Sequence, residues 1–154
     1  MTRKPGSKKK AFAEHMSTYR YNLRFEGKVS PQDEMGENMG IEATATLGLG
    51  SDPAIGAPGA SVQFNALVTN DMDGSFTIHG EVVLAGGTLA LTSAGSGTMK
   101  ETPDPTLQQG TLTCQVESGT GSFSGASGTV TLNFTVGEDA RFTDLQTGLV
   151  FVTD

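Results

Sequence analysis

Apolar and polar side chains alternate with a period of two along most of the chain after residue 16. In the first such segment, Tyr19 and Tyr21 belong to the apolar set, and Arg20 and Asn22 belong to the polar set. This period predicts a half-buried β-strand with one apolar and one polar face. The same alternation recurs in residues 41–49, 62–68, 76–84, 111–117 and 129–136, and shorter extended pieces are predicted at 88–93, up to about 101, and at 149–152.

The connections between these segments are rich in Gly, Pro, Asn and Asp, and no convincing amphipathic helix interrupts them. About eight short strands at even spacing predict a sandwich or a barrel. Short connections favour up-and-down pairing, and closure removes the sheet edges that invite aggregation. We therefore predict an all-β fold for residues 17–154, a closed antiparallel eight-stranded up-and-down barrel of the calycin-like kind.

The composition fits one barrel domain. A chain of 154 residues has room for a single core. It contains 21 Gly and no Trp, so the core must be built from small and medium side chains, as in barrels where small and large groups alternate. No apolar run approaches the ~20 residues of a membrane-spanning helix, and no membrane partner is expected.

The charges are unevenly distributed. Residues 1–16 hold five of the ten basic side chains and one acid, so the other 138 residues carry 5 basic and 16 acidic groups, a net charge of −11. An acidic barrel repels nucleic acid and anionic membranes, and neither is expected as a partner. The run Lys8–Lys10 indicates a flexible basic tail over residues 1–16, or a leader that is not native, rather than a polyanion-binding arm.

The single cysteine, Cys114, excludes an intramolecular disulfide. The basic residues near the start of the chain are not followed by the apolar stretch that a secretory signal needs. Together these features predict a cytoplasmic protein in a reducing compartment. Cys114 lies in the apolar phase beside Leu112 and Val116, which indicates a small buried hydrophobic group rather than a nucleophile.

One segment resembles a known family. Residues 117–132 read ESGTGSFSGASGTVTL, in which a G-x-G-x-F-x-G-A-x-G stretch leads into a predicted strand. This Gly119–Gly128 turn resembles the late glycine-rich turn of the allene oxide cyclase-like and dirigent-like barrels. The resemblance implies an eight-stranded barrel with a central cavity, a possible homo-oligomer (dimer or trimer), and a family in which some members cyclise or orient reactive intermediates. It carries over no catalytic residue, because no other segment matches a catalytic motif of that family.

Several motifs that imitate known sites are better explained as structure. The Gly119–Gly128 stretch precedes a Thr- and Val-rich strand instead of the helix that a phosphate cradle needs, so it predicts a tight barrel corner. Asp71, Asp73 and Gly74 imitate the start of a calcium loop but lack its remaining ligands, and predict a hairpin turn. His79 has no partners at metal-ligand spacing. No cofactor and no metal are therefore expected.

The candidate ligand site is the interior that the apolar phases would share once the barrel closes. The apolar phase of the predicted strands contains no charged residue, and its hydroxyl groups are the phenols of Tyr19 and Tyr21. Tyr21 and Tyr19 are accordingly the catalytic candidates, as groups that polarise a carbonyl. The candidate ligand-binding residues in the same phase are Phe64, Phe76, Cys114 and Phe134.

The alternation leaves open which face lines the lumen. Small barrels usually fill their interior with apolar groups, and an apolar pocket suits a hydrophobic small molecule. In the alternative arrangement the polar phase lines the lumen and the apolar phase contacts a partner subunit. The residues that would then meet inside are Arg24, Glu26, Glu42, Gln63, His79 and Glu81.

Three functions are compatible with this sequence. The leading hypothesis is a cofactor-independent cyclase or isomerase that holds a hydrophobic substrate in the lumen by shape. The second is a non-catalytic barrel that binds a similar ligand, and the third is a structural oligomer with a packed interior. A lumen of ~300 Å³ or more with a mouth would favour the first two, and a filled lumen would favour the third. Whether the chain is an enzyme stays open at this point.

Overall fold

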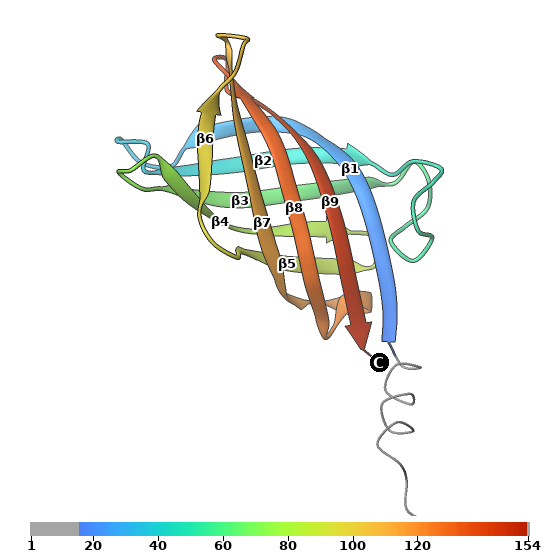
Figure 1. Ribbon diagram of the computed structural model, residues 1–154. Helices are drawn as coiled ribbons and strands as arrows, with labels where there is room; N and C mark the ends of the chain where they lie inside the picture. Colours follow the sequence, from blue (N-terminus) through green and yellow to red (C-terminus); the bar gives the residue numbers. More distant parts are fainter. Residues whose placement is uncertain (1–15, 154) are drawn as a thin grey trace, which may run out of the picture.

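The computed structural model describes residues 16–153 and consists almost entirely of β-strands (Figure 1). A short 3₁₀ helix, η1 (Gly121–Phe123), is the one helical element of this part of the chain. The strands are β1 (Met16–Pro31), β2 (Asn38–Thr46), β3 (Ser61–Asn70), β4 (Ser75–Leu84), β5 (Gly87–Ser93), β6 (Gly97–Glu101), β7 (Leu107–Gly119), β8 (Ala126–Gly137) and β9 (Arg141–Thr153).

The strands close into a barrel. Antiparallel neighbours follow the order β3-β2-β1-β9-β8-β7-β5-β4, and the pairing of β3 with β4 completes the circle. The short strand β6 lies between β4 and β7 and continues the line of β5, so the two share one position in the wall. The prediction of a closed eight-stranded antiparallel barrel with up-and-down order is confirmed.

The apolar phase of the alternation faces inward. Phe25, Phe64 and Leu132 are completely buried, whereas Arg24 and Glu26 form an ion pair at 3.2 Å with about two thirds of each side chain exposed. The other residues named for a polar lumen lie on the outside too. The alternative with polar side chains in the interior is therefore wrong.

The last strand is longer than the sequence pattern predicted. A strand was expected only over residues 149–152, but β9 begins at Arg141 and pairs with β1 along the whole length from Lys28 to Met16. The alternation did not reveal residues 141–148 as a strand, because some inward-facing positions there are polar and an outward-facing one is apolar. Asp144 and Gln146 point inward and are at most 1% exposed, while Leu145 points outward and is 57% exposed.

Loop side chains close the barrel end where β1 begins and β9 finishes. Ile55, from the connection between β2 and β3, and Phe123, from η1, are both buried in the core. The turn that carries Phe123 contains Gly121 and Gly125 with φ of +60° and +77°, a conformation that favours glycine. The Gly119–Gly128 stretch is thus the tight corner that the sequence predicted.

Candidate functional site

The opposite end of the barrel is surrounded by four loops, residues 32–37, 71–74, 102–106 and 138–140. Backbone hydrogen bonds connect loop 32–37 to the end of β3, just before loop 71–74, and loop 138–140 to loop 102–106. The amide of Asn70 donates to the carbonyl oxygen of Glu37 at 2.7 Å, and the amide of Glu138 donates to that of Thr106 at 3.0 Å. We call this end of the barrel the open end, and the four loops form its rim.

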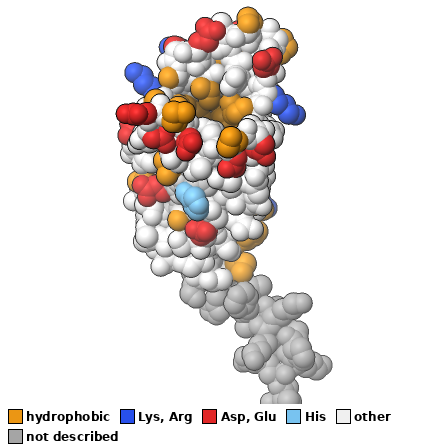
Figure 2. Space-filling model, turned by 90° about the vertical axis from the view of Figure 1, so that its left-hand side faces the viewer, with side chains coloured by type: hydrophobic (Ala, Val, Ile, Leu, Met, Phe, Trp, Pro, Cys, Tyr) orange, Lys and Arg blue, Asp and Glu red, His pale blue; other side chains and the backbone are white. Residues whose placement is uncertain are grey.

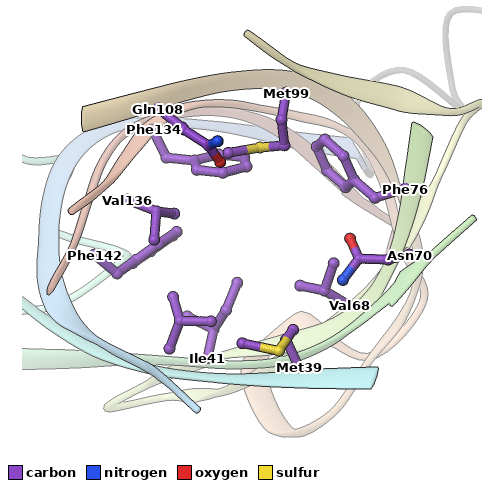
Figure 3. A pocket seen from close by; sticks show the side chains of 11 residues that line it. Met39, Ile41, Val68, Asn70, Phe76, Met99, Gln108, Phe134, Val136 and Phe142 are labelled. Atoms are coloured by element: carbon purple, nitrogen blue, oxygen red, sulfur yellow. The ribbon is translucent and has the colours of Figure 1, made fainter. Parts of the chain in front are cut away.

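A cavity of about 160 Å³ lies just inside the open end (Figure 3). Nine of its eleven lining residues are apolar, and they come from strands all round the barrel. Met39 and Met99 lie on opposite sides, with Phe76, Phe134 and Phe142 between them. In the described part of the chain, no ionisable side chain lines this cavity.

Packed aromatic rings form the cavity floor and stop it from extending deeper. Phe142 and Phe134 have ring centroids 5.4 Å apart, and Phe134 contacts Phe76 at 5.7 Å. Below them, Phe64 stacks on Phe142 at 6.4 Å and meets Phe25 at 5.7 Å. The interior beneath the cavity is filled. The cavity, at about 160 Å³, is therefore smaller than the lumen of ~300 Å³ that would favour the first two functions, and most of the interior is packed, as the third function expects.

Two amide side chains, Asn70 and Gln108, supply the polar part of the cavity wall. Both end groups lie at the cavity edge in Figure 3. The Nδ2 atom of Asn70 donates to the carbonyl oxygen of Gly36 at 3.1 Å, so that Oδ1 is the atom free to accept a bond. Gln108 is exposed and pairs across the strands with Glu101. These amides can bind a polar group that stays near the mouth.

Acidic side chains crowd the rim. Figure 2 views the barrel from the side of the open end. In the upper half of that view an apolar hollow has acidic groups on both sides, and basic groups lie only at the outer flanks. The four rim loops contain no Lys or Arg. Their eight carboxylates are those of Asp33, Glu34, Glu37, Asp71, Asp73, Asp104, Glu138 and Asp139.

A buried chain of hydrogen bonds lies below the phenylalanine floor. The hydroxyl of Tyr21 donates to Oε1 of Gln146 at 2.7 Å, and Nε2 of Gln146 donates to Oδ2 of Asp144 at 3.0 Å. The backbone amide of Asn133 donates to Oδ1 of Asp144 at 3.0 Å. Gly148 makes this chain possible, because a Cβ there would lie 2.1 Å from the ring of Tyr21.

This network changes the proton affinities of its members. Burial raises the pKa of Asp144 to about 6, although the hydrogen bonds from Gln146 and Asn133 lower it. Burial raises the pKa of Tyr21 above its ordinary value, and the nearby Asp144 charge raises it further. Burial and the same charge raise the pKa of Cys114 to about 12. Neither the phenol nor the thiol is therefore activated as a nucleophile or base.

The structure brings only part of the predicted site together. Phe76 and Phe134 line the cavity. Phe64 and Cys114 are fully buried in the packed interior, outside the lining. Tyr21 points inward as expected, but its hydroxyl is bound to Gln146. Tyr19 is half-buried at the closed end, where its ring meets Phe123 edge-on at 6.1 Å.

Sequence reasoning missed Met39, Met99, Asn70 and Gln108. One signal was present in the chain. Four of its six methionines, at positions 35, 39, 72 and 99, fall in or beside segments that meet at the open end. Methionine is common at surfaces that adapt to apolar ligands. Recognising this cluster required the strand directions, which place these four positions at one end.

Other kinds of site find little support in residues 16–153. No cluster of three or more His, Cys, Asp or Glu there is arranged to hold a metal ion. His79 lies on the outer face of β4, where its Nδ1 atom is 3.3 Å from the Thr92 hydroxyl. The same residues include no helix long and apolar enough to span a bilayer.

Comparison with known proteins places the fold in a recognised class. No family model matches the sequence, and no curated protein is significantly similar to it. Among solved structures, the chain is similar to a pterocarpan synthase dirigent protein, with a TM-score of 0.66. That match covers 92% of this chain and 91% of the other, at 13% sequence identity. The chain therefore has the barrel fold of a dirigent protein, as the Gly119–Gly128 turn suggested.

Proposed function

We propose that this barrel binds a hydrophobic small molecule at its open end. The observation that carries the proposal is the apolar cavity of about 160 Å³, bounded by Met39, Met99 and the phenylalanine floor. Binding sites of this type combine apolar walls with a few polar groups that orient the ligand. Asn70 and Gln108 supply those groups here.

The size of the cavity limits what can enter. An engineered protein cavity of ~150 Å³ binds benzene. The cavity here therefore accepts a single aromatic ring or a short alkyl group. A larger ligand would leave its remaining part at the mouth, between the rim loops and within reach of the two amides.

The proposal can be tested with a neutral single-ring probe, 2-phenylethanol, and a variant that fills the cavity. Val136 is half-buried in the lining, so Val136→Phe places a ring in the space. The matched control is Val83→Phe, which makes the same change at a half-buried position on the outer face of β4. Probe affinity is measured by calorimetry and amide NMR.

We expect the wild type and Val83→Phe to bind alike and Val136→Phe to lose about tenfold or more in affinity, which corresponds to ~1.4 kcal/mol. Thermal melting shows whether both variants remain folded. Equal binding by all three proteins would place the ligand elsewhere. No binding by the folded wild type would favour the third hypothesis, a structural barrel with a packed interior.

A second candidate function is a cyclase or isomerase reaction of the bound molecule. It is favoured by the fold shared with a pterocarpan synthase dirigent protein. Because the lining lacks ionisable side chains, the contribution of this cavity would be to hold a flexible substrate in a reactive conformation. The amides of Asn70 and Gln108 would hold a carbonyl or hydroxyl of the substrate.

This second function predicts stereochemical control of a reaction that also proceeds without protein. Aryl substrates that cyclise spontaneously to racemic products would give enantiomerically enriched product with the wild type and racemic product with Val136→Phe. Racemic product from a substrate that demonstrably binds the wild type would support the non-catalytic binding function instead.

A further inference from the structure

The ligand of the open end has a chemistry that can be inferred from the rim. We infer that the cavity takes a cationic amphiphile, a molecule with one ring or short alkyl group inside and a protonated amine at the mouth. This inference rests on the proposed binding function. It is carried by the charge, the polar atoms and the position of the rim loops.

Negative charge is distributed very unequally between the two ends of the barrel. The four rim loops carry eight carboxylates, whereas the three connections at the closed end, residues 47–60, 85–86 and 120–125, carry one, Asp52. A ninth carboxylate, Glu101, lies on the inward-facing side of β6 two residues after Met99 and pairs with Gln108. Acidic groups are therefore concentrated around the open end and are not spread evenly over the barrel.

The basic residues near this end do not neutralise it. Lys28, Lys100 and Arg141 are exposed and lie on outward-facing positions of their strands. Arg141 approaches Asp139 only to 3.9 Å, and both side chains are about two thirds or more exposed. An amine at the mouth would therefore meet a surplus of negative charge with few competing cations.

Some of the rim carboxylates have a structural role that also keeps them ionised. Asp33 accepts bonds from the side chain of Asn38 and from backbone amides, which lowers its pKa. Asp73 and Asp104 have lowered pKa values for the same reason, through Ser75 and Thr106. The loops thus need these acids for their shape and present their charge at the same time.

The cavity edge offers oxygen acceptors beside amide donors, because Asn70 and Gln108 each carry a side-chain carbonyl oxygen. One N–H of Asn70 Nδ2 donates to the carbonyl oxygen of Gly36, and Oδ1 stays available as an acceptor at the cavity edge. Two acidic residues neighbour Asn70 along the backbone: Asp71 follows it, and the backbone carbonyl oxygen of Glu37 accepts a bond from its amide. Acceptors with negative charge around them match the three N–H donors of an ammonium group and disfavour a carboxylate.

Three ring compounds of similar size separate this inference from the function on which it rests. They are 2-phenylethylammonium, neutral 2-phenylethanol and anionic 3-phenylpropionate, each titrated at pH 7 in low salt and in 0.5 M salt. At low salt we expect the cation to bind about fivefold more tightly than the alcohol and the anion to bind least, an effect that high salt screens. In high salt the three affinities should converge.

The source of the preference is tested by removing charge at the rim. The variant Glu37→Gln/Glu101→Gln/Glu138→Gln changes three carboxylates whose side chains lie at the open end. The control Glu42→Gln/Glu81→Gln/Glu117→Gln makes the same change in net charge on the outer wall. The rim variant should lose most of the cation preference and keep its affinity for the alcohol, while the control keeps both.

The outcomes are distinguishable. Equal binding of the cation and the alcohol by the wild type in low salt would overturn the charge inference and leave hydrophobic binding intact. The same conclusion would follow if both triple variants lost the preference equally. Absence of binding by all three compounds would overturn the proposed binding function itself.

Discussion

The two ends of this barrel use their loops in opposite ways. At the closed end, Ile55 and Phe123 turn inward from the loops and are at most 2% exposed. At the open end, Met35 and Met72 turn outward and are 83% and 106% exposed, and a cavity remains beneath them. The same eight-stranded wall is thus sealed at one end for stability and left accessible at the other. This contrast explains why a barrel with a largely packed interior can still present a binding site.

The contrast is tested most strongly by truncating one side chain at each end. Phe123→Ala should lower the free energy of unfolding by about 3–5 kcal/mol, because it removes a buried ring and leaves a void. Met99→Ala should cost about 1 kcal/mol, since Met99 is only partly buried and already borders empty space. Urea denaturation of the two variants measures both values. Similar losses at the two ends would contradict the comparison.

The second prediction concerns Asp144, which lies between the two ends. Burial raises its pKa in the folded protein to about 6 from the ordinary 3.8. An acid that holds its proton more tightly when folded stabilises the fold fully below the unfolded pKa and loses that contribution as the pH rises through 6. The shift corresponds to about 3 kcal/mol.

The variant Asp144→Asn does not titrate, so its stability relative to the wild type should rise by about 2 kcal/mol between pH 4 and pH 7. Urea denaturation at a series of pH values measures this difference. Glu117→Gln, which changes an exposed carboxylate, serves as the control and should give a flat difference. A flat difference for Asp144→Asn as well would show that burial does not raise its pKa.

The third prediction separates structure from catalysis at Tyr21. Tyr21→Phe leaves Oε1 of Gln146 without its donor and should cost about 1–2 kcal/mol. The affinity for 2-phenylethanol should stay within about twofold, because Tyr21 does not line the cavity. The hypothesis of a catalytic phenol predicts the reverse, an unchanged stability with weakened binding or turnover. Calorimetry and denaturation on the same samples decide between them.

The smallest effect is expected from the exposed methionines. Met35→Ser/Met72→Ser should change stability by less than about 0.5 kcal/mol, because neither side chain is buried. Its affinity for the apolar probe should fall about twofold to threefold if these side chains close over the ligand, in the way flexible methionines adapt to apolar surfaces. Leu49→Ser is the control, since Leu49 is 93% exposed in a closed-end loop. An equal affinity change in both proteins would remove the methionines from the site.

The sequence predicted the barrel because its wall follows a simple rule. Inward-facing positions such as Phe25, Phe64 and Leu132 are apolar and their neighbours are polar, so the period of two is visible without the structure. The rule fails in β9, where Asp144 and Gln146 face inward and Leu145 faces outward. Their burial depends on hydrogen bonds that alternation does not reveal: Gln146 bonds Tyr21, 125 residues away, and Asp144 accepts from the backbone amide of Asn133 on the neighbouring strand.

The position of the cavity was not predictable from alternation. Outside β9 the inward-facing sets look equally apolar, and the free space depends on what the loops at each end insert. Nothing local distinguishes Phe123, which turns inward, from Met72, which stays outside. The aromatic positions Phe76 and Phe134 were named correctly as inward-facing, but their place in the lining follows from strand register and barrel closure.

The most direct test of this account is an amide NMR titration of the wild type with 2-phenylethanol, mapped onto the two ends. We predict that shift changes concentrate at the rim loops 32–37, 71–74, 102–106 and 138–140 and at lining residues such as Val68 and Met99. Residues 47–60 and 120–125 at the closed end should stay unchanged. Changes that cluster at the closed end, or on the outer wall around His79, would contradict the assignment of the open end as the ligand site.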